Sequence, residues 1–192
     1  YWTFQGGFQT AAHLVMGNND PSNSVSTPLV LPIALSYVVA SAGGQDVNGD
    51  GIPDFVLGGF NATFTSGTVA IYLGCDQAVC DVATLTTADA VFTLPGRLLS
   101  GVNLIGNFHQ RAGDTAAFAD ILVGGSSLPG GTDTTTWVIA GRSVWADVEI
   151  QTSTGVASDN ANNTNGVTTL QTMTAVPGQS AAAIADLNGD GF

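Results

Sequence analysis

The chain has 192 residues, of which only 9% are charged, and its 15 acidic residues outnumber three cationic ones to give a formal net charge of −12. A surface this acidic repels polyanions, which argues against nucleic-acid binding and favours cations as partners. The length suits one domain with a sizeable core. No run of 18 apolar residues occurs, so we expect no membrane insertion.

The predicted elements are short strands that end in turn residues, because β-branched and aromatic residues alternate with clusters of glycine, asparagine and serine. The most apolar stretch, 28–44, is expected to be a fully buried strand. Polar, low-complexity residues at 155–169 are expected to form a long surface loop. The other predicted strands, in chain order, are 13–18, 54–59, 66–74, 83–94, 120–125, 131–141 and 147–154. A strand followed by a polar loop is expected over each of 34–51, 98–114 and 180–191.

Similar strands recur along the chain in the same order, and this pattern indicates an internal repeat. The stretch "DFVLGG" (54–59) matches "DILVGG" (120–125), and each is followed by a strand closed by glycine. Four short strands per unit are typical of β-propeller blades. We therefore predict an all-β fold of about three propeller-like blades, within one repeat domain that is a piece of a longer protein. The approximate units are 1–33, 34–97, 98–179 and the start of another at 180–192. A β-sandwich whose hairpins are similar by chance is the alternative.

An acidic loop at 46–54, "DVNGDGIPD", lies between the first and second strands of its unit. Glycine at 49 and 51 allows the chain to curl around one point. Oxygen ligands at alternating loop positions suit a hard cation such as Ca²⁺. Leu57 stands where an EF-hand loop would have its closing glutamate, so this loop leads into a strand. The predicted ligands are Asp46, Asn48, Asp50, Asp54 and the carbonyl of Ile52. An Asx-rich turn without an ion is the alternative.

Two further loops are related to this one. The stretch 186–192 repeats the start of the pattern with Asp186, Asn188 and Asp190, and Phe192 stands at the carbonyl-ligand position. The loop at 106–120 keeps the terminal Asp120 but carries an arginine and is longer. We therefore expect the loop at 106–120 to bind metal weakly or not at all.

These residues resemble a known family. The stretch "ALSYVVASAGGQDVNGDGIPDFVLGGF" followed by "SGTVAIYLG" resembles the FG-GAP repeat of integrin α-subunit-like β-propellers and of bacterial VCBS-type surface proteins. The resemblance covers 34–74 best, and 98–141 and 180–192 less well. It implies a calcium loop between the first two strands of a blade. It also implies that the acidic and amide side chains at 46–54 and 186–190, with the Ile52 carbonyl, are Ca²⁺ ligands.

Two kinds of covalent site are candidates. Cys75 and Cys80 are separated by four residues, and a disulfide between them would indicate an oxidising compartment. Two unpaired thiols are the alternative. Asn61 and Asn162 each begin an N-glycosylation sequon. The two histidines, His13 and His109, lie in no nucleophile motif, so we expect structural roles for both.

The sequence therefore predicts a non-enzymatic, extracellular or cell-surface calcium-binding repeat protein with an adhesive or structural role. Its expected partners are calcium, glycans or other surface proteins, and copies of itself. A carbohydrate-binding propeller module and an accessory domain of a secreted hydrolase are the alternatives. Function inferred from fold resemblance is analogy, because one fold supports many activities.

Overall fold

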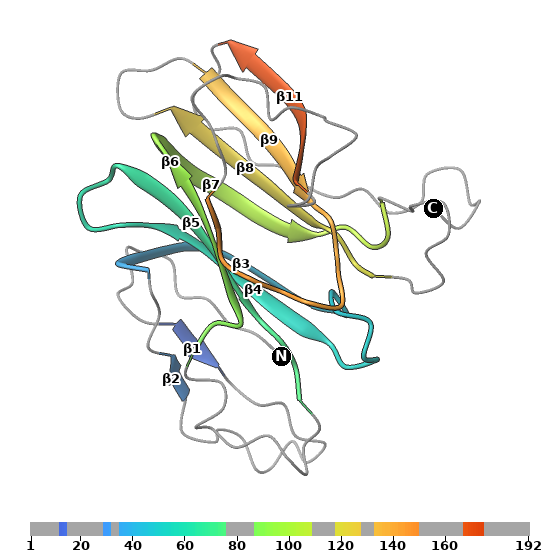
Figure 1. Cartoon of the computed structure of the whole chain (residues 1–192). Coiled ribbons are helices and arrows are strands. Elements are labelled where there is room, and N and C mark those ends of the chain that lie inside the picture. The colour runs from blue at the N-terminus through green and yellow to red at the C-terminus, as the bar shows by residue number, and fades with distance from the viewer. Residues whose placement is uncertain are drawn as a thin grey trace, which may run out of the picture.

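A computed structural model describes residues 12–14, 29–31, 35–75, 87–108, 118–127, 133–149 and 167–174. All regular elements in these ranges are strands, as the composition predicts (Figure 1). No helix in them has the length and apolarity needed to cross a bilayer. The strands are β1 (Ala12–Leu14), β2 (Leu29–Leu31), β3 (Tyr37–Gln45), β4 (Asp54–Phe60), β5 (Ser66–Tyr72), β6 (Ala90–Pro95), β7 (Arg97–Leu104), β8 (Ile121–Ser127), β9 (Asp133–Ile139), β10 (Val148–Glu149) and β11 (Val167–Thr174).

The strands form three sheets. The first sheet has five strands in the order β10-β6-β5-β4-β3, and the second has four in the order β11-β9-β8-β7. All pairs are antiparallel except β10 with β6, and β1 and β2 form a separate two-stranded sheet. The first sheet contains the four-stranded meander β3-β4-β5-β6, and the second sheet is the four-stranded meander β7-β8-β9-β11. Within the described ranges, the strands close neither a barrel nor a propeller ring.

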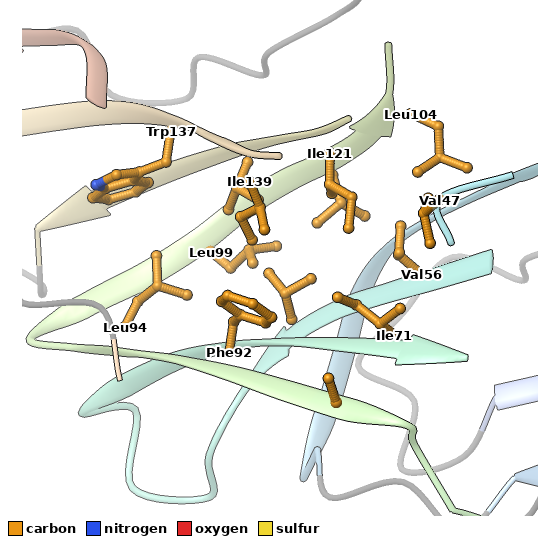
Figure 2. Packing of buried hydrophobic residues seen from close by; sticks show 14 of the residues in the cluster. Val47, Val56, Ile71, Phe92, Leu94, Leu99, Leu104, Ile121, Trp137 and Ile139 are labelled. Atoms are coloured by element: carbon orange, nitrogen blue, oxygen red, sulfur yellow. The ribbon is translucent and has the colours of Figure 1, made fainter. Parts of the chain in front are cut away.

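The core lies between the two large sheets. Period-2 alternation sends Val56, Ile71 and Phe92 from the first sheet toward Ile121 and Ile139 of the second (Figure 2). Each of these five side chains is fully shielded from solvent. Gly58 of β4 lies where a Cβ atom would come within 2.8 Å of Val102 in β7. Its lack of a side chain therefore lets β7 cross closely over the first sheet.

The two meanders share details of strand geometry. In the first, the register shifts between Val38 and Ala40, opposite a Gly-Gly pair at 58–59. In the second, it shifts between Leu99 and Gly101, opposite the Gly-Gly pair at 124–125. Both bulges lie between the first and second strands of the meander, at the same distance from the preceding aspartate. A β-bulge is a specific structural feature of a strand pair and not a defect, so its recurrence at matched positions is a further similarity between the meanders.

The faces of the two meanders that correspond in sequence point in the same direction across the pair of packed sheets. Phe55 and Leu57 in β4 correspond to Ile121 and Val123 in β8. Ile121 and Val123 belong to the core between the sheets, whereas Phe55 and Leu57 belong to a second cluster on the opposite face of the first sheet. The second sheet therefore packs on the first by unlike faces. This is head-to-tail stacking, in which each unit can present the same face to its neighbour.

Most predicted strands are present. The strands expected at 54–59, 66–74, 120–125 and 131–141 match β4, β5, β8 and β9, and the strand expected at the start of 98–114 matches β7. The strand expected at 83–94 is β6, which begins at Ala90. The one expected at 13–18 matches β1 in part, with 15–18 outside the described residues.

Two predictions are wrong, and the loop predicted at 155–169 is wrong at 167–169, since 155–166 lie outside the described residues. The stretch 28–44 is not one fully buried strand: it holds β2 and the start of β3, and β3 is an edge strand with Ser41 exposed. The stretch 147–154 does not supply the fourth strand of the second sheet, because β10 pairs with β6 of the first sheet. That fourth strand is β11, which begins inside the predicted loop at 155–169. Its threonines favour a strand although their polarity indicates a loop.

Candidate metal centre

The acidic loop lies between β3 and β4, where the sequence predicts it. Gly49 and Gly51 have φ angles of +79° and +83°, which side-chain-bearing residues rarely adopt. The two left-handed residues turn the backbone so that its amides point at Asp46. The Oδ1 atom of Asp46 accepts the N–H groups of Asn48 at 3.1 Å and Gly49 at 2.5 Å, and Oδ2 accepts that of Gly51 at 2.6 Å.

Asp50 and Asn48 lie together in the same curl. The Asn48 side chain donates from Nδ2 to Oδ2 of Asp50 at 2.8 Å, and its Oδ1 accepts the Asp50 N–H at 3.1 Å. Oδ1 of Asp50 accepts the Ile52 N–H at 2.7 Å. Each Asp50 oxygen accepts one hydrogen bond from the loop, and a carboxylate oxygen has two lone pairs. Both Asp50 oxygens therefore keep acceptor capacity, and the Asp50 side chain is exposed.

Asp54 differs from the other acids because it is buried, with 1% of its surface exposed. Its Oδ2 accepts the Val47 N–H at 2.6 Å, and its Oδ1 accepts the Gly74 N–H at 2.6 Å. Burial raises the pKa of the Asp54 carboxyl, and the two amide hydrogen bonds oppose that rise. The negative charges of Asp50 and Asp46 raise this pKa further. The carboxylates of Asp46 and Asp50 are therefore close enough to repel that of Asp54.

The side-chain oxygens of Asp46, Asn48 and Asp50 have the chemistry that a hard cation requires of its ligands. No group of three or more histidine, cysteine, aspartate or glutamate side chains within the described ranges is arranged to hold a metal ion. The mixed oxygen set of Asp46, Asn48 and Asp50 remains, to which the Ile52 carbonyl is a predicted addition. Carboxylate, amide and carbonyl oxygens with water are the ligands Ca²⁺ takes. Asp54 has a structural role that the sequence did not indicate, since its two oxygens anchor backbone amides.

The loop is also a joint between the two sheets. The carbonyl of Asp46 accepts the Ala119 N–H at 2.7 Å, and that of Val47 accepts the Arg142 N–H at 2.9 Å. Ala119 and Arg142 belong to the second meander. The ring of Phe118 lies so close to Gly49 that a Cβ atom there would overlap it. The conformation of the acidic loop and the placement of the second sheet are thus linked by direct contacts.

Gln45, at the end of β3, adds a second link between the sheets. Its Nε2 donates to the Leu104 carbonyl at 3.2 Å, and its Oε1 accepts the Gly106 N–H at 2.7 Å. Both partners lie at the end of β7. One amide side chain therefore satisfies a donor and an acceptor of the second sheet beside the acidic loop. The sequence reasoning missed Gln45, which directly precedes the loop.

Asp120 repeats the structural role of Asp54 in the second meander. It is 2% exposed, and its Oδ1 accepts the Gly141 N–H at 2.8 Å. In both meanders an aspartate directly before the second strand binds the glycine that follows the third strand. The separations are 20 residues for Asp54–Gly74 and 21 for Asp120–Gly141. We call this hydrogen bond the Asp–Gly clasp. The recurring spacing was a signal in the sequence that could have identified it.

The other predicted metal ligands lie outside the described residues. These are Asp186, Asn188, Asp190 and Phe192. In the loop at 106–120, residues 109–117 are likewise outside, so its capacity for metal stays a prediction.

The candidate covalent sites are placed in part. Cys75 lies just after β5, whereas Cys80 lies outside the described residues, so a disulfide between these two stays a prediction. Asn61 lies in the hairpin between β4 and β5. Asn162 and His109 fall outside the described residues.

Comparison with known proteins gives no further guide. No family model, no curated protein and no solved structure shows significant similarity to the chain.

Proposed function

We propose that the chain is an extracellular, non-enzymatic calcium-binding repeat protein with an adhesive or structural role. The observation that carries this proposal is the set of oxygen atoms of the half-buried Asp46 and Asn48 and the exposed Asp50. These side chains are gathered by two left-handed glycines beside a third, buried carboxylate. In a chain of net charge −12, a divalent cation would relieve the repulsion among these groups.

The way the two sheets pack supports a propeller-like arrangement of the repeats. The two sheets pack with non-equivalent faces in contact. The two outer faces are therefore also non-equivalent, and they suit the packing of further units of the same kind. Heterologous stacking of this sort generates a ring if the rotation between units closes, and an open array if it does not. A repeat array of either kind presents loops along one surface, which suits binding of glycans, of other surface proteins or of copies of the same chain.

A bound cation would act on this architecture through the contacts of the loop. Holding Asp46 and Asp50 in place fixes the backbone carbonyls of Asp46 and Val47, which bind the second sheet. Calcium would thus stiffen the joint between neighbouring units. A disulfide between Cys75 and Cys80 would be consistent with the same oxidising, extracellular setting.

Direct titration of calcium by calorimetry tests the proposal. We expect saturable binding to the wild-type chain, and a loss of roughly tenfold or more in affinity at that site for Asp50→Asn, because Ca²⁺ affinity depends on the charge of its ligands. Asp89→Asn is the matched control: it removes the same charge from an exposed residue outside the loop. Binding that is absent from the wild type, or equal in Asp50→Asn and Asp89→Asn, contradicts a site at 46–54.

A further inference from the structure

The hairpin that joins β4 to β5 carries a sequon on an accessible surface. The sequon is Asn61, Ala62 and Thr63, in which Asn61 is half-buried and the next two residues are exposed. The Asn61 N–H donates to the Ser66 carbonyl at 3.1 Å, and the Phe64 N–H donates to the Asn61 carbonyl at 3.1 Å. The sequon therefore occupies a tight, closed turn at the tip of a hairpin.

The Asn61 side chain is bonded in a way that leaves room for a substituent on its nitrogen. Its Oδ1 accepts the N–H groups of Thr65 at 2.9 Å and Ser66 at 3.3 Å. Its Nδ2 donates to the Thr65 hydroxyl at 2.9 Å. An amide nitrogen carries two hydrogens, and one bond to the hydroxyl uses only one of them. The second hydrogen of Nδ2 takes part in none of these hydrogen bonds.

Phe64, the residue directly after the sequon, is unusual in its backbone. Its φ of 57° is the only positive value of a non-glycine residue in the described ranges. The left-handed conformation costs a residue with a side chain roughly 1–2 kcal/mol, so glycine or asparagine is the usual choice there. Its ring stacks on Tyr37 at 5.1 Å between centroids and lies 5.0 Å from Phe60, yet 38% of the residue is exposed. The chain thus holds an aromatic ring at the surface beside the sequon at a local energetic cost.

We propose that Asn61 carries an N-linked glycan whose first sugar lies against the exposed Phe64 ring. In the attachment step, Nδ2 of Asn61 forms a bond to the anomeric carbon of an oligosaccharide held on a lipid diphosphate. The bond from that carbon to the diphosphate oxygen breaks, the lipid diphosphate leaves with the electron pair, and one amide proton passes to a base. The apolar C–H face of the sugar then covers apolar ring surface that would otherwise face water. The inference rests on the extracellular setting of the proposed function.

Mass spectrometry of the secreted protein tests the attachment. The chain would be expressed in a eukaryotic secretory host together with a reporter of known glycosylation, then treated with a peptide amidase that converts glycosylated asparagine to aspartate. We expect conversion at Asn61 in the wild type and in Asn162→Gln, and its loss in Thr63→Ala. Recovery of unmodified Asn61 from a host that has glycosylated the reporter overturns the proposal.

Thermal unfolding before and after removal of the glycan tests the role of Phe64. We expect the glycan to raise the unfolding midpoint of the wild type by roughly 2 °C, a shift that corresponds to less than about 1 kcal/mol for a chain of this size. In Phe64→Leu, which keeps an apolar side chain without the ring, the glycan should remain while this shift disappears. An equal shift in both proteins overturns the stacking. Calcium titration of Asn61→Gln distinguishes the two proposals, because calcium binding there leaves the proposed function intact whatever the outcome at Asn61.

Discussion

At the scale of single residues, Tyr72 carries a polar group that its buried surroundings leave unsatisfied. Its side chain is fully buried and stacks on Phe55 at 4.7 Å between centroids. Its hydroxyl has no hydrogen-bond partner in the described part of the chain. A buried hydroxyl without a partner costs about 1–3 kcal/mol. Tyr72→Phe should therefore stabilise the fold by about 1 kcal/mol at neutral pH, as measured by chemical denaturation.

The same residue predicts how stability depends on alkaline pH. Burial raises the pKa of Tyr72 to about 12, and the charge of Asp89 contributes to the rise. In the unfolded chain the phenol ionises near pH 10. Because the folded-state pKa lies above the unfolded-state value, this contribution to stability is complete below about pH 10 and is lost as the pH rises toward 12. Denaturation at pH 7 and pH 11 should show a larger decline for the wild type than for Tyr72→Phe. Equal declines would mean that Tyr72 does not carry this dependence.

At the scale of residues, the sequence predicts the acidic loop but not the contacts that the loop makes with distant parts of the chain. Alternating oxygen-bearing residues and glycines at 46–51 predicted a curled, acidic loop, because those spacings are local. Local spacing does not show that Asp54 faces two backbone amides, since Gly74 becomes its neighbour only when β4 pairs with β5, and only the recurring Asp–Gly separation indicates that contact. For the same reason, the local sequence pattern does not predict the contact between Phe118 and Gly49, which are far apart in the chain.

At the scale of elements, the Asp–Gly clasp holds the end of one strand to the start of its neighbour. In Asp54→Ala the N–H groups of Val47 and Gly74 would lose their acceptor. An orphaned donor in a shielded position costs about 1–3 kcal/mol, so we expect a loss of roughly 2 kcal/mol or more. Asp89→Ala is the control, since Asp89 also accepts an amide, that of Leu73, but is exposed to water that can replace it. Equal losses of unfolding free energy for the two variants would contradict the structural role of Asp54.

Element prediction succeeded where patterns of apolar residues were strong. The strands β4 and β8 were predicted because both follow an aspartate and end in a pair of glycines. The strand β11 was missed because threonine-rich residues at 167–174 are as polar as a loop, and only pairing with β9 selects the strand. The parallel pairing of β10 with β6 in the other sheet depends on tertiary contact and has no local signal.

At the scale of the whole molecule, the two sheets are linked through the acidic loop, and hydrogen exchange can measure the link. The amides of Ala119 and Arg142 bind the carbonyls of Asp46 and Val47. If calcium orders the loop, adding a chelator should accelerate exchange of these two amides by about tenfold, a change of about 1.4 kcal/mol in opening free energy. The Val69 amide, in the middle of β5, is a control that should change less. Unchanged exchange at Ala119 and Arg142 would mean that the loop and the joint are independent.

The overall architecture was predicted in part. Repetition in the sequence correctly indicated an all-β fold of small antiparallel sheets, since unit-sized similarity is visible without tertiary information. The head-to-tail packing of those sheets was not accessible, because a strand such as β4 is buried on both faces and its pattern does not reveal which neighbour covers which face.

Thermal unfolding of the wild-type chain with calcium and with chelator tests the central claim most directly. An ion bound only by the folded chain stabilises it by about 2.7 kcal/mol at a hundredfold excess over its dissociation constant. We therefore predict a midpoint several degrees higher in calcium, with most of the increase absent from Asp50→Asn. Identical midpoints in calcium and in chelator would contradict a calcium-stabilised loop at 46–54.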